Sequence, residues 1–287
     1  MILLVNTGWF IGAVVSAVFV IVYPIVLAIL ANRRLKVSWR YFGYGALIFF
    51  LFQIITRVPL VIFIQRAIAP QLQASLPLRI TWYIVLALTA GLFEEIGRYI
   101  GYRWLMRREE KTWSKAVMYG IGHGGLESML LVGGQLLLAL FNIVLISFAG
   151  FRILSTAQRI GVIEQFAAIN GMPAWTALLG GWERLWTMPF HIAMSVLVLQ
   201  VFRRQNMLWL WLAVLLHTIL DAFAVLLPEW LGPEVNTSLT VEGVVTIFGL
   251  GALWIIWRLR DHDEPTVSEV VTSSETPSNM TVAPDGQ

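Results

Sequence analysis

Ionisable side chains interrupt two strongly apolar stretches of this sequence. The first stretch contains Glu94, Glu95 and Arg98, and the second contains His123 and Glu127. A charged side chain at the centre of a bilayer costs roughly 2.5–3.5 kcal/mol on insertion scales. Carboxylates and imidazoles are also the groups that activate water, transfer protons and bind metal ions. These residues therefore indicate a functional site within apolar surroundings rather than a contribution to stability.

The composition defines the broad class of the protein. Its 287 residues are 58% hydrophobic and 13% charged, and the mean hydropathy is +0.75. Because soluble proteins carry about 25% charged residues, the chain is expected to be a polytopic membrane protein in contact with the lipid bilayer. The net charge of +3 does not indicate a nucleic-acid partner, since the basic residues lie in short clusters between apolar runs. The absence of cysteine excludes disulfides and thiolate metal ligands.

Seven apolar segments are each long enough, at about 20 residues, to cross a bilayer. They predict an all-α, polytopic helical bundle with about seven transmembrane helices. The fourth segment would be about 50 Å long as one helix, so it must tilt, kink or break, and the glycine pairs 124–125 and 133–134 are candidate break points. The predicted spans cover residues 9–30, 41–64, 80–104, 116–148, 182–202, 207–227 and 241–257.

Basic residues mark alternate connections between the predicted spans. They cluster in residues 33–40, 103–115, 203–204 and 258–260, and the other connections are poorer in Lys and Arg. The positive-inside rule then places the N-terminus outside and the C-terminus in the cytoplasm of a multi-pass cell-membrane protein. Residues 1–260 are expected to form the transmembrane domain, and residues 261–287, rich in Ser, Thr, Glu and Pro, a disordered cytoplasmic tail. An amphipathic piece at 151–168 is expected on the outer surface.

Four of the predicted spans carry an ionisable side chain at a similar depth. Counted from the predicted cytoplasmic ends, Glu95, His123, His191 and His217 lie roughly 10–17 Å into the membrane at 1.5 Å per residue. Unrelated polar residues would be scattered in depth. The shared depth therefore predicts that these side chains meet in one buried site.

The spacing of acids and histidines supports the same site. Residues four apart share a helix face, so His123 is expected beside Glu127, and His217 beside Asp221. In isolation, an intramembrane histidine is more often a helix–helix hydrogen-bonding residue than a ligand. Several spans carry an ionisable side chain at one depth, and each such side chain is costly in a membrane. This repetition favours a functional cluster.

The two adjacent glutamates are expected to differ in role. Glu94 and Arg98 are four residues apart and can form an ion pair. Glu95 points about 100° away and is then free. A free carboxyl in a dry pocket near a second carboxylate is a candidate general base.

Other polar and small residues have structural interpretations. Gln53 and Arg57 in the second span are interpreted as packing or cavity-lining residues. Glu183 and Arg184 are expected to pair with each other or to extend toward the membrane surface. The glycines between residues 120 and 125 are expected to permit close helix packing.

Four motifs follow one another along the chain. They are Glu94-Glu95-Ile-Gly-Arg98, Gly120-Ile-Gly-His123-Gly-Gly-Leu-Glu127, Glu183-Arg184 followed by His191-Ile-Ala-Met-Ser195, and His217-Thr-Ile-Leu-Asp221. In this order they resemble the YhfC family of intramembrane proteases, over nearly the whole chain from the first span to about residue 260. That family is grouped with the CAAX prenyl protease and bacteriocin-processing, PrsW and Aph-1 families.

The resemblance implies roles for these residues. By analogy with the CAAX-type enzymes, Glu94 or Glu95 would activate water, His123 would assist, and His217 with Asp221 would stabilise the oxyanion. Two positions depart from the CAAX pattern. Arg98 is one residue closer to the glutamates, as in PrsW, which leaves open which glutamate is the base. Asp221 replaces an asparagine, so it must be protonated, orient the histidine or bind a metal.

The leading hypothesis is an intramembrane endopeptidase that cleaves near the cytoplasmic leaflet with glutamate-activated water. His123, fixed by Glu127, would position the water or protonate the leaving amine, and His217 would stabilise the oxyanion. This version favours no cofactor. The close alternative is a zinc-dependent protease in which His123, His191 and His217, with a carboxylate, bind the metal. The absence of a His-Glu-x-x-His motif lowers the weight of this alternative.

Two hypotheses of other classes remain open. Carboxylates and histidines at membrane depth also form proton relays in transporters, although the chain shows no internal repeat. A non-catalytic membrane scaffold would also keep polar residues. For the protease, the expected substrate is a membrane-embedded or lipidated peptide.

Overall fold

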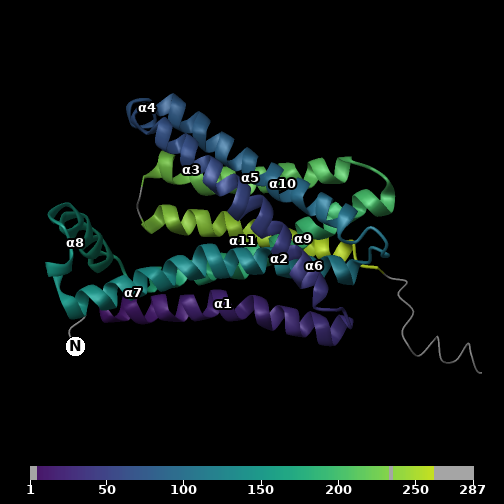
Figure 1. The fold of residues 1–287 in the computed structure, drawn as a ribbon, viewed down its shortest axis with the longest axis horizontal. Helices are drawn as coiled ribbons and strands as arrows, with labels where there is room; N and C mark the ends of the chain where they lie inside the picture. The colour runs from purple at the N-terminus through teal and green to yellow at the C-terminus, as the bar shows by residue number, and fades with distance from the viewer. Residues whose placement is uncertain (1–4, 233–234, 262–287) are drawn as a thin grey trace, which may run out of the picture.

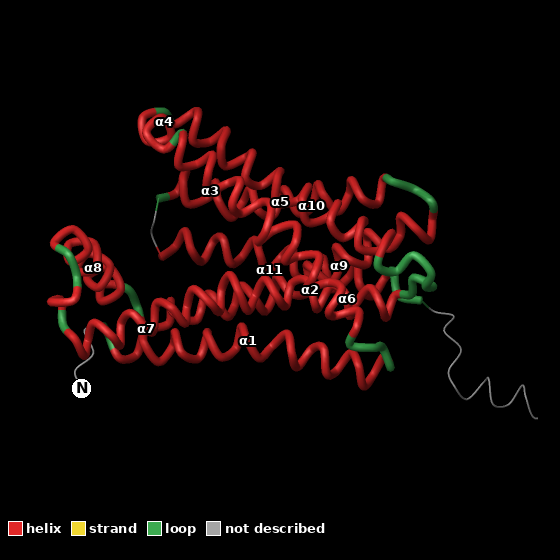
Figure 2. The backbone as a smooth tube through the Cα atoms, viewed as in Figure 1, coloured by secondary structure: helices red, strands yellow, loops and turns green. Residues whose placement is uncertain are grey.

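A computed structural model describes residues 5–232 and 235–261 of the chain. Within these ranges every regular element is helical, and the long helices run side by side (Figures 1 and 2). The elements are α1 (Thr7–Leu35), α2 (Arg40–Phe49), a π-helical segment (Phe50–Arg57), α3 (Val58–Ala67), α4 (Ala69–Ala74), α5 (Leu76–Trp104), α6 (Trp113–Glu127), a second π-helical segment (Ser128–Gly133), α7 (Gly134–Ala149), a 3₁₀ turn (Phe151–Ile153), α8 (Thr156–Gly171), a 3₁₀ turn (Ala174–Leu178), α9 (Leu179–Arg204), α10 (Leu208–Leu231) and α11 (Val235–Arg258).

The predicted all-α bundle is confirmed. In the described part of the chain, seven helical stretches are long and apolar enough to span a membrane. Each contains one of the predicted segments or nearly all of it. They are Thr7–Leu35, Arg40–Ala67, Leu76–Trp104, Trp113–Ala149, Ala174–Arg204, Leu208–Leu231 and Val235–Arg258.

The helix α9 lies at the centre of the bundle. Most of its residues are buried, whereas only a minority is buried in the most apolar window of each of the other spans. It packs against α1, α5, α6, α10 and α11. The basic end of the bundle carries residues 33–40, 103–115, 203–204 and 258–260. The opposite end, where α1 begins at Thr7, is the N-terminal end.

Glycines bring α6 into backbone contact with its neighbours. A Cβ at Gly122 would overlap the carbonyl oxygen of Phe42 on α2, and one at Gly45 would overlap that of Tyr119. On another face of α6, a Cβ at Gly120 would lie 2.6 Å from the Cα of Ile192 on α9. The close helix packing predicted from the glycines at 120–125 is therefore confirmed, and it fixes the positions of two site helices, α6 and α9.

The overlong fourth span crosses without a break. The helix continues through both glycine pairs that were candidate break points, and it instead widens into the π-helical segment between them. In that segment the Ser128 hydroxyl donates to the Val20 carbonyl on α1, at 2.7 Å. A similar π-helical segment, Phe50–Arg57, interrupts the second span. Such segments occur frequently at functional sites.

The connection after the fourth span contains α8, a helix that overlaps the segment predicted to be amphipathic. It begins later than expected, at Thr156, because Ser155 and Gln158 form a capping box there. Phe166 of α8 packs against Ile143 and Ile146 of α7. At the other end of the chain, Asp261 accepts a hydrogen bond from the Trp113 backbone. The rest of the predicted disordered tail lies outside the described residues.

Replacing Gly122 with alanine tests the contact between α2 and α6. Because the added methyl group would meet backbone rather than a movable side chain, the helices must separate, and overpacking of this kind costs typically 1–3 kcal/mol. We expect Gly122→Ala to lower the thermal midpoint of the detergent-purified protein. Gly43→Ala, on α2 with nothing within 4 Å of its Cβ, is the control. Equal midpoints for both variants would contradict the close contact.

Candidate active site

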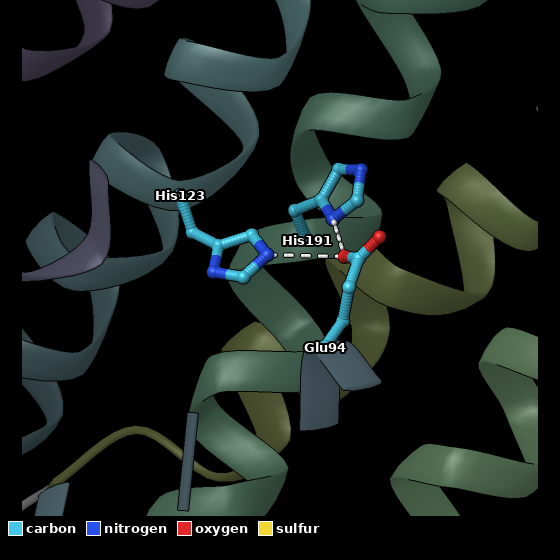
Figure 3. Close-up of side chains that lie close together, drawn as sticks. All are labelled: Glu94, His123 and His191. Atoms are coloured by element: carbon cyan, nitrogen blue, oxygen red, sulfur yellow. Dashed lines mark hydrogen bonds and ion pairs between the residues drawn. The ribbon is translucent and has the colours of Figure 1, made fainter. Parts of the chain in front are cut away.

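Four helices converge on the carboxylate of Glu94. Its Oε2 atom lies 3.0 Å from Nε2 of His123, 3.7 Å from Nδ1 of His191 and 3.8 Å from Nε2 of His217. Figure 3 shows His123 and His191 each joined to the same carboxylate oxygen of Glu94. The side chains come from α5, α6, α9 and α10 and are all buried. The predicted meeting of polar residues from separate spans is therefore observed.

Arg98 balances the charge of the two glutamates. Its guanidinium is fully buried and forms an ion pair with Glu95, and Nη2 lies 3.4 Å from Oε2 of Glu94. Nη2 also lies 2.9 Å from Nδ1 of His191. Since arginine only donates hydrogen bonds, that nitrogen of His191 must be an acceptor. A buried carboxylate without such a partner would be strongly unfavourable.

The expectation that Glu95 is the free glutamate is wrong. Glu95 is fully buried, pairs with Arg98 and accepts a hydrogen bond at 2.7 Å from Nδ1 of His217. The ion pair of Glu94 with Arg98 is present but longer. The two glutamates do point to different faces of α5, as helix periodicity predicts. The expectation failed because Arg98 and α10 both lie on the face that carries Glu95. Glu94 is the glutamate that faces the cavity described below.

Glu127 does not fix His123, contrary to the prediction from their spacing. One oxygen of Glu127 accepts a hydrogen bond from Arg184 at 2.9 Å, and the other lies 3.0 Å from Nε2 of His191. Nδ1 of His123 has no hydrogen-bond partner among the described residues. The predicted pairing of Glu183 with Arg184 is confirmed. The packing of α9 against α6 thus links residues that no single-helix spacing could connect.

Asp221 lies at the edge of the cluster. Its Oδ2 atom is 3.9 Å from Nε2 of His217, and a third of its side chain is exposed. The predicted proximity of these two residues is therefore observed, although the contact is long. The catalytic roles assigned to all these residues remain predictions.

A polar cavity of about 190 Å³ opens from the cluster. Glu94, about 15 Å from the basic end by helix rise, lies at its inner limit, and Arg184 lies about 30 Å from that end. On the other side of the cluster, the stacked rings of Tyr102 and Tyr119 are fully buried. The cavity therefore extends toward the N-terminal end. Its polar lining is Gln53, Arg57, Glu94, Glu127, Glu183, Arg184, Thr187, His191, His217 and Asp221.

Two residues of the second span belong to the site more closely than the sequence indicated. Gln53 and Arg57 line the cavity as predicted, but Gln53 also donates a hydrogen bond to Oε1 of Glu94 at 2.7 Å. Two polar residues four positions apart in an apolar span were the available signal. The sequence could not show that this face of the span turns toward Glu94.

The donor set fits a divalent metal ion such as zinc. Two groups of donors, both including Glu94, have all their ligand atoms within 4.8 Å of one another: Glu94 with His123 and His191, and Glu94 with Glu95 and His217. Imidazole nitrogens and a carboxylate oxygen are ordinary zinc ligands. The ring nitrogens that face away from Glu94 lie beside other carboxylates. Nδ1 of His217 is 2.7 Å from Glu95, and Nε2 of His191 is 3.0 Å from Glu127. Such outer carboxylates orient metal-binding histidines in many zinc sites.

Comparison with known proteins agrees with this combination of fold and site, a multi-pass helical membrane protein with a buried glutamate–histidine cluster. The family model described as YhfC intramembrane metalloprotease matches residues 19–245. The chain therefore belongs to the YhfC family. It is 31% identical over 259 residues to the Bacillus subtilis (strain 168) protein named uncharacterized membrane protein YhfC, covering 84% of this chain and 93% of that protein. No solved structure matches.

The family description bears on the activity predicted from the sequence. It supports an intramembrane protease and its metal-dependent version. The preference for a glutamate-only mechanism without a cofactor is not supported by the comparison. The buried Glu94 and histidine donors agree with the metal-dependent version.

Cysteine labelling tests the direction in which the cavity opens. The chain contains no cysteine, so single cysteines can be introduced without removing others. Thr187 lines the cavity, whereas Ser195, two turns nearer the basic end of α9, is fully buried. We expect Thr187→Cys to react with a small, membrane-impermeant methanethiosulfonate applied to the face that carries the N-terminus, and Ser195→Cys to remain unmodified. Modification of Ser195→Cys alone, from the opposite face, would show that the cavity opens toward the basic end.

Proposed function

We propose that this protein is a metal-dependent intramembrane endopeptidase whose reaction centre is Glu94 with the surrounding histidines. The observation that carries the proposal is the convergence of three imidazole nitrogens, from three helices, within 3.0–3.8 Å of one carboxylate oxygen. Such a cluster in apolar surroundings costs stability, and it has the composition of a hydrolytic metal centre.

We assign Glu94, His123 and His217 as the residues that hold the metal. The donor groups already within 4.8 Å join His123 to His191 and His217 to Glu95, so the rings of His123 and His217 must move closer together when the metal binds. His191 is the fourth nearby donor, but its Nδ1 atom accepts a hydrogen bond from Arg98. Three protein ligands with one open position are typical of catalytic zinc sites. A bound zinc ion supplies Lewis-acid polarisation and a water molecule that ionises near neutral pH. Glu95 keeps His217 oriented through the bond to Nδ1.

The pair formed by His191 and Glu127 is assigned to proton transfer. Both side chains line the cavity, and Nε2 of His191 lies 3.0 Å from Glu127. Peptide hydrolysis requires that a proton leaves the attacking water and that the departing amine receives one. Because both ring nitrogens of His191 face other groups, the carboxylate of Glu127 is the member of the pair that takes the proton and returns it, and His191 positions that carboxylate. Arg184, bound to the other oxygen of Glu127, holds this carboxylate in place.

The proposed substrate is a membrane-embedded or lipidated peptide that reaches the site through the polar cavity. The position of the cavity modifies the expectation of cleavage near the cytoplasmic leaflet. Because the cavity extends from Glu94 toward Arg184, the peptide would approach from the N-terminal end, predicted to be the outer side. Tyr102 and Tyr119 close the direct route from the basic end.

A glutamate-only mechanism is the second candidate, and one contact favours it. Arg98 lies 3.4 Å from Oε2 of Glu94 and 2.9 Å from His191, so a cation already stands beside the donors. In this version Glu94, which faces the cavity, would itself take the proton from water. The two mechanisms share Glu94 but differ in their response to chelators.

Cleavage by reconstituted protein tests the proposal. Fluorophore-labelled synthetic single-span peptides in liposomes serve as the probe. We expect wild-type protein to cleave at least one of them, a chelator to stop cleavage, and added zinc to restore it. Glu94→Gln should reduce the rate at least about 100-fold, because both metal binding and charge are lost.

The control for this experiment is Glu229→Gln. Glu229 is also a carboxylate within a span, but it pairs with Arg79 far along the helix from the site, at 2.6 Å. Its replacement should leave the rate close to that of the wild type. Cleavage that persists in the chelator and is lost in Glu94→Gln would overturn the metal-dependent mechanism in favour of glutamate alone. Full activity of Glu94→Gln would overturn both.

A further inference from the structure

Gln53 joins the second span to the reaction centre. Its Nε2 atom donates a hydrogen bond to Oε1 of Glu94 at 2.7 Å, and its Oε1 atom accepts one from Nη1 of Arg57 at 3.2 Å. Arg57 is in turn held by the Leu86 carbonyl at 2.6 Å and by the Thr89 hydroxyl at 3.3 Å, both on α5. A chain of hydrogen bonds therefore begins and ends on the helix that carries Glu94.

The chemistry of Arg57 determines the orientation of the Gln53 amide. A guanidinium can only donate hydrogen bonds, so the amide oxygen of Gln53 must face Arg57. The amide nitrogen must then face Glu94, and it offers a donor to Oε1. The reverse orientation would place two donors against each other and two acceptors against each other. The arrangement thus favours the ionised carboxylate of Glu94.

This hydrogen bond separates the two oxygens of Glu94. Oε1 is occupied by Gln53, while Oε2 faces His123, His191 and His217. A carboxylate free to rotate about its last bond could present either oxygen or both. The bond from Gln53 leaves one oxygen available to the histidine side of the site.

The π-helical segment Phe50–Arg57 presents Gln53 to the site. Gln53 is 3% exposed and is the buried residue of this segment, while Leu51 and Ile55 are exposed on its outer side. Burying a glutamine in an apolar span is unfavourable unless its amide is paired. Its pairing with a charged residue of the reaction centre offsets this cost.

We propose that Gln53, held by Arg57, is a positioning residue that restricts Glu94 to binding the metal through a single oxygen. This inference rests on the proposed metal-dependent function and extends it to the second span. Outer residues that orient metal ligands typically contribute 10–100-fold to metal affinity. Neither residue touches the metal in this assignment, so each acts through Glu94.

The test is the zinc affinity of detergent-purified full-length variants, measured by competition with a chromophoric chelator. Gln53→Met replaces the amide with an apolar group of similar length and is expected to weaken zinc binding about 10–100-fold. Gln53→Asn keeps a buried amide but is one methylene too short to bridge Arg57 and Glu94. It should weaken binding as well, and it serves if the methionine variant does not fold.

Gln200→Met is a matched control. Gln200 is also 3% exposed in a span and also accepts a hydrogen bond from an arginine four residues later, Arg204, at 3.0 Å. It has no contact with the reaction centre, so its replacement imposes a similar loss of buried amide without affecting Glu94. Zinc affinity of this variant should equal that of the wild type.

The outcomes separate this inference from the function on which it rests. Wild-type zinc binding with weaker binding in the Gln53 variants alone supports the positioning role. Wild-type affinity in the folded Gln53 variants would overturn it while leaving the metal centre intact. An equal loss in Gln200→Met would show a general packing effect and would also overturn it. A wild-type protein that binds no zinc would overturn the metal-dependent function itself.

Discussion

The charge balance around Arg98 is the constraint on which the rest of the site depends. Two adjacent carboxylates lie in the apolar interior of a helical bundle, and one fully buried guanidinium lies between them. Removing one partner of such a buried pair is typically destabilising by about 3–5 kcal/mol, because a charge is left uncompensated. Glu95 forms an ion pair with Arg98 and accepts a hydrogen bond from His217. Oε2 of Glu94 faces the three histidines, and this difference between the two glutamates defines the proposed reaction centre.

Helix packing makes this arrangement possible. Glycines allow α6 to touch α2 and α9 at backbone distance, which brings His123 and His191 to the same carboxylate oxygen of Glu94. Because these contacts involve backbone, they leave little freedom for the helices to shift. The π-helical segment Phe50–Arg57 adds Gln53 and Arg57 to the polar lining of the cavity, and the second π-helical segment begins directly after Glu127. The site is therefore built from rigid elements, as precise catalytic geometry requires.

The sequence predicted the spans and the residues of the cluster, because apolar length and the cost of buried charge are both readable from the chain. It did not predict the pairs within the cluster. Spacing along one helix predicted Glu127 beside His123, but in the structure α9 packs so that Glu127 contacts Arg184 and His191. The same reason applies to Glu95, which depends on the rotation of α5 against α10. The hydrogen bond from Gln53 to Glu94 was missed because one sequence does not show which face of the second span turns inward.

X-ray absorption at the zinc K-edge of the purified wild-type protein reports the atoms around the metal rather than the consequences of binding. We expect stoichiometric zinc with nitrogen and oxygen neighbours at about 2.0–2.1 Å and the outer scattering of imidazole rings. His217→Ala should reduce the imidazole contribution without unfolding the protein. Absence of bound zinc, or zinc bound by oxygen alone without imidazole scattering, would contradict a metal centre built on Glu94 and the histidines.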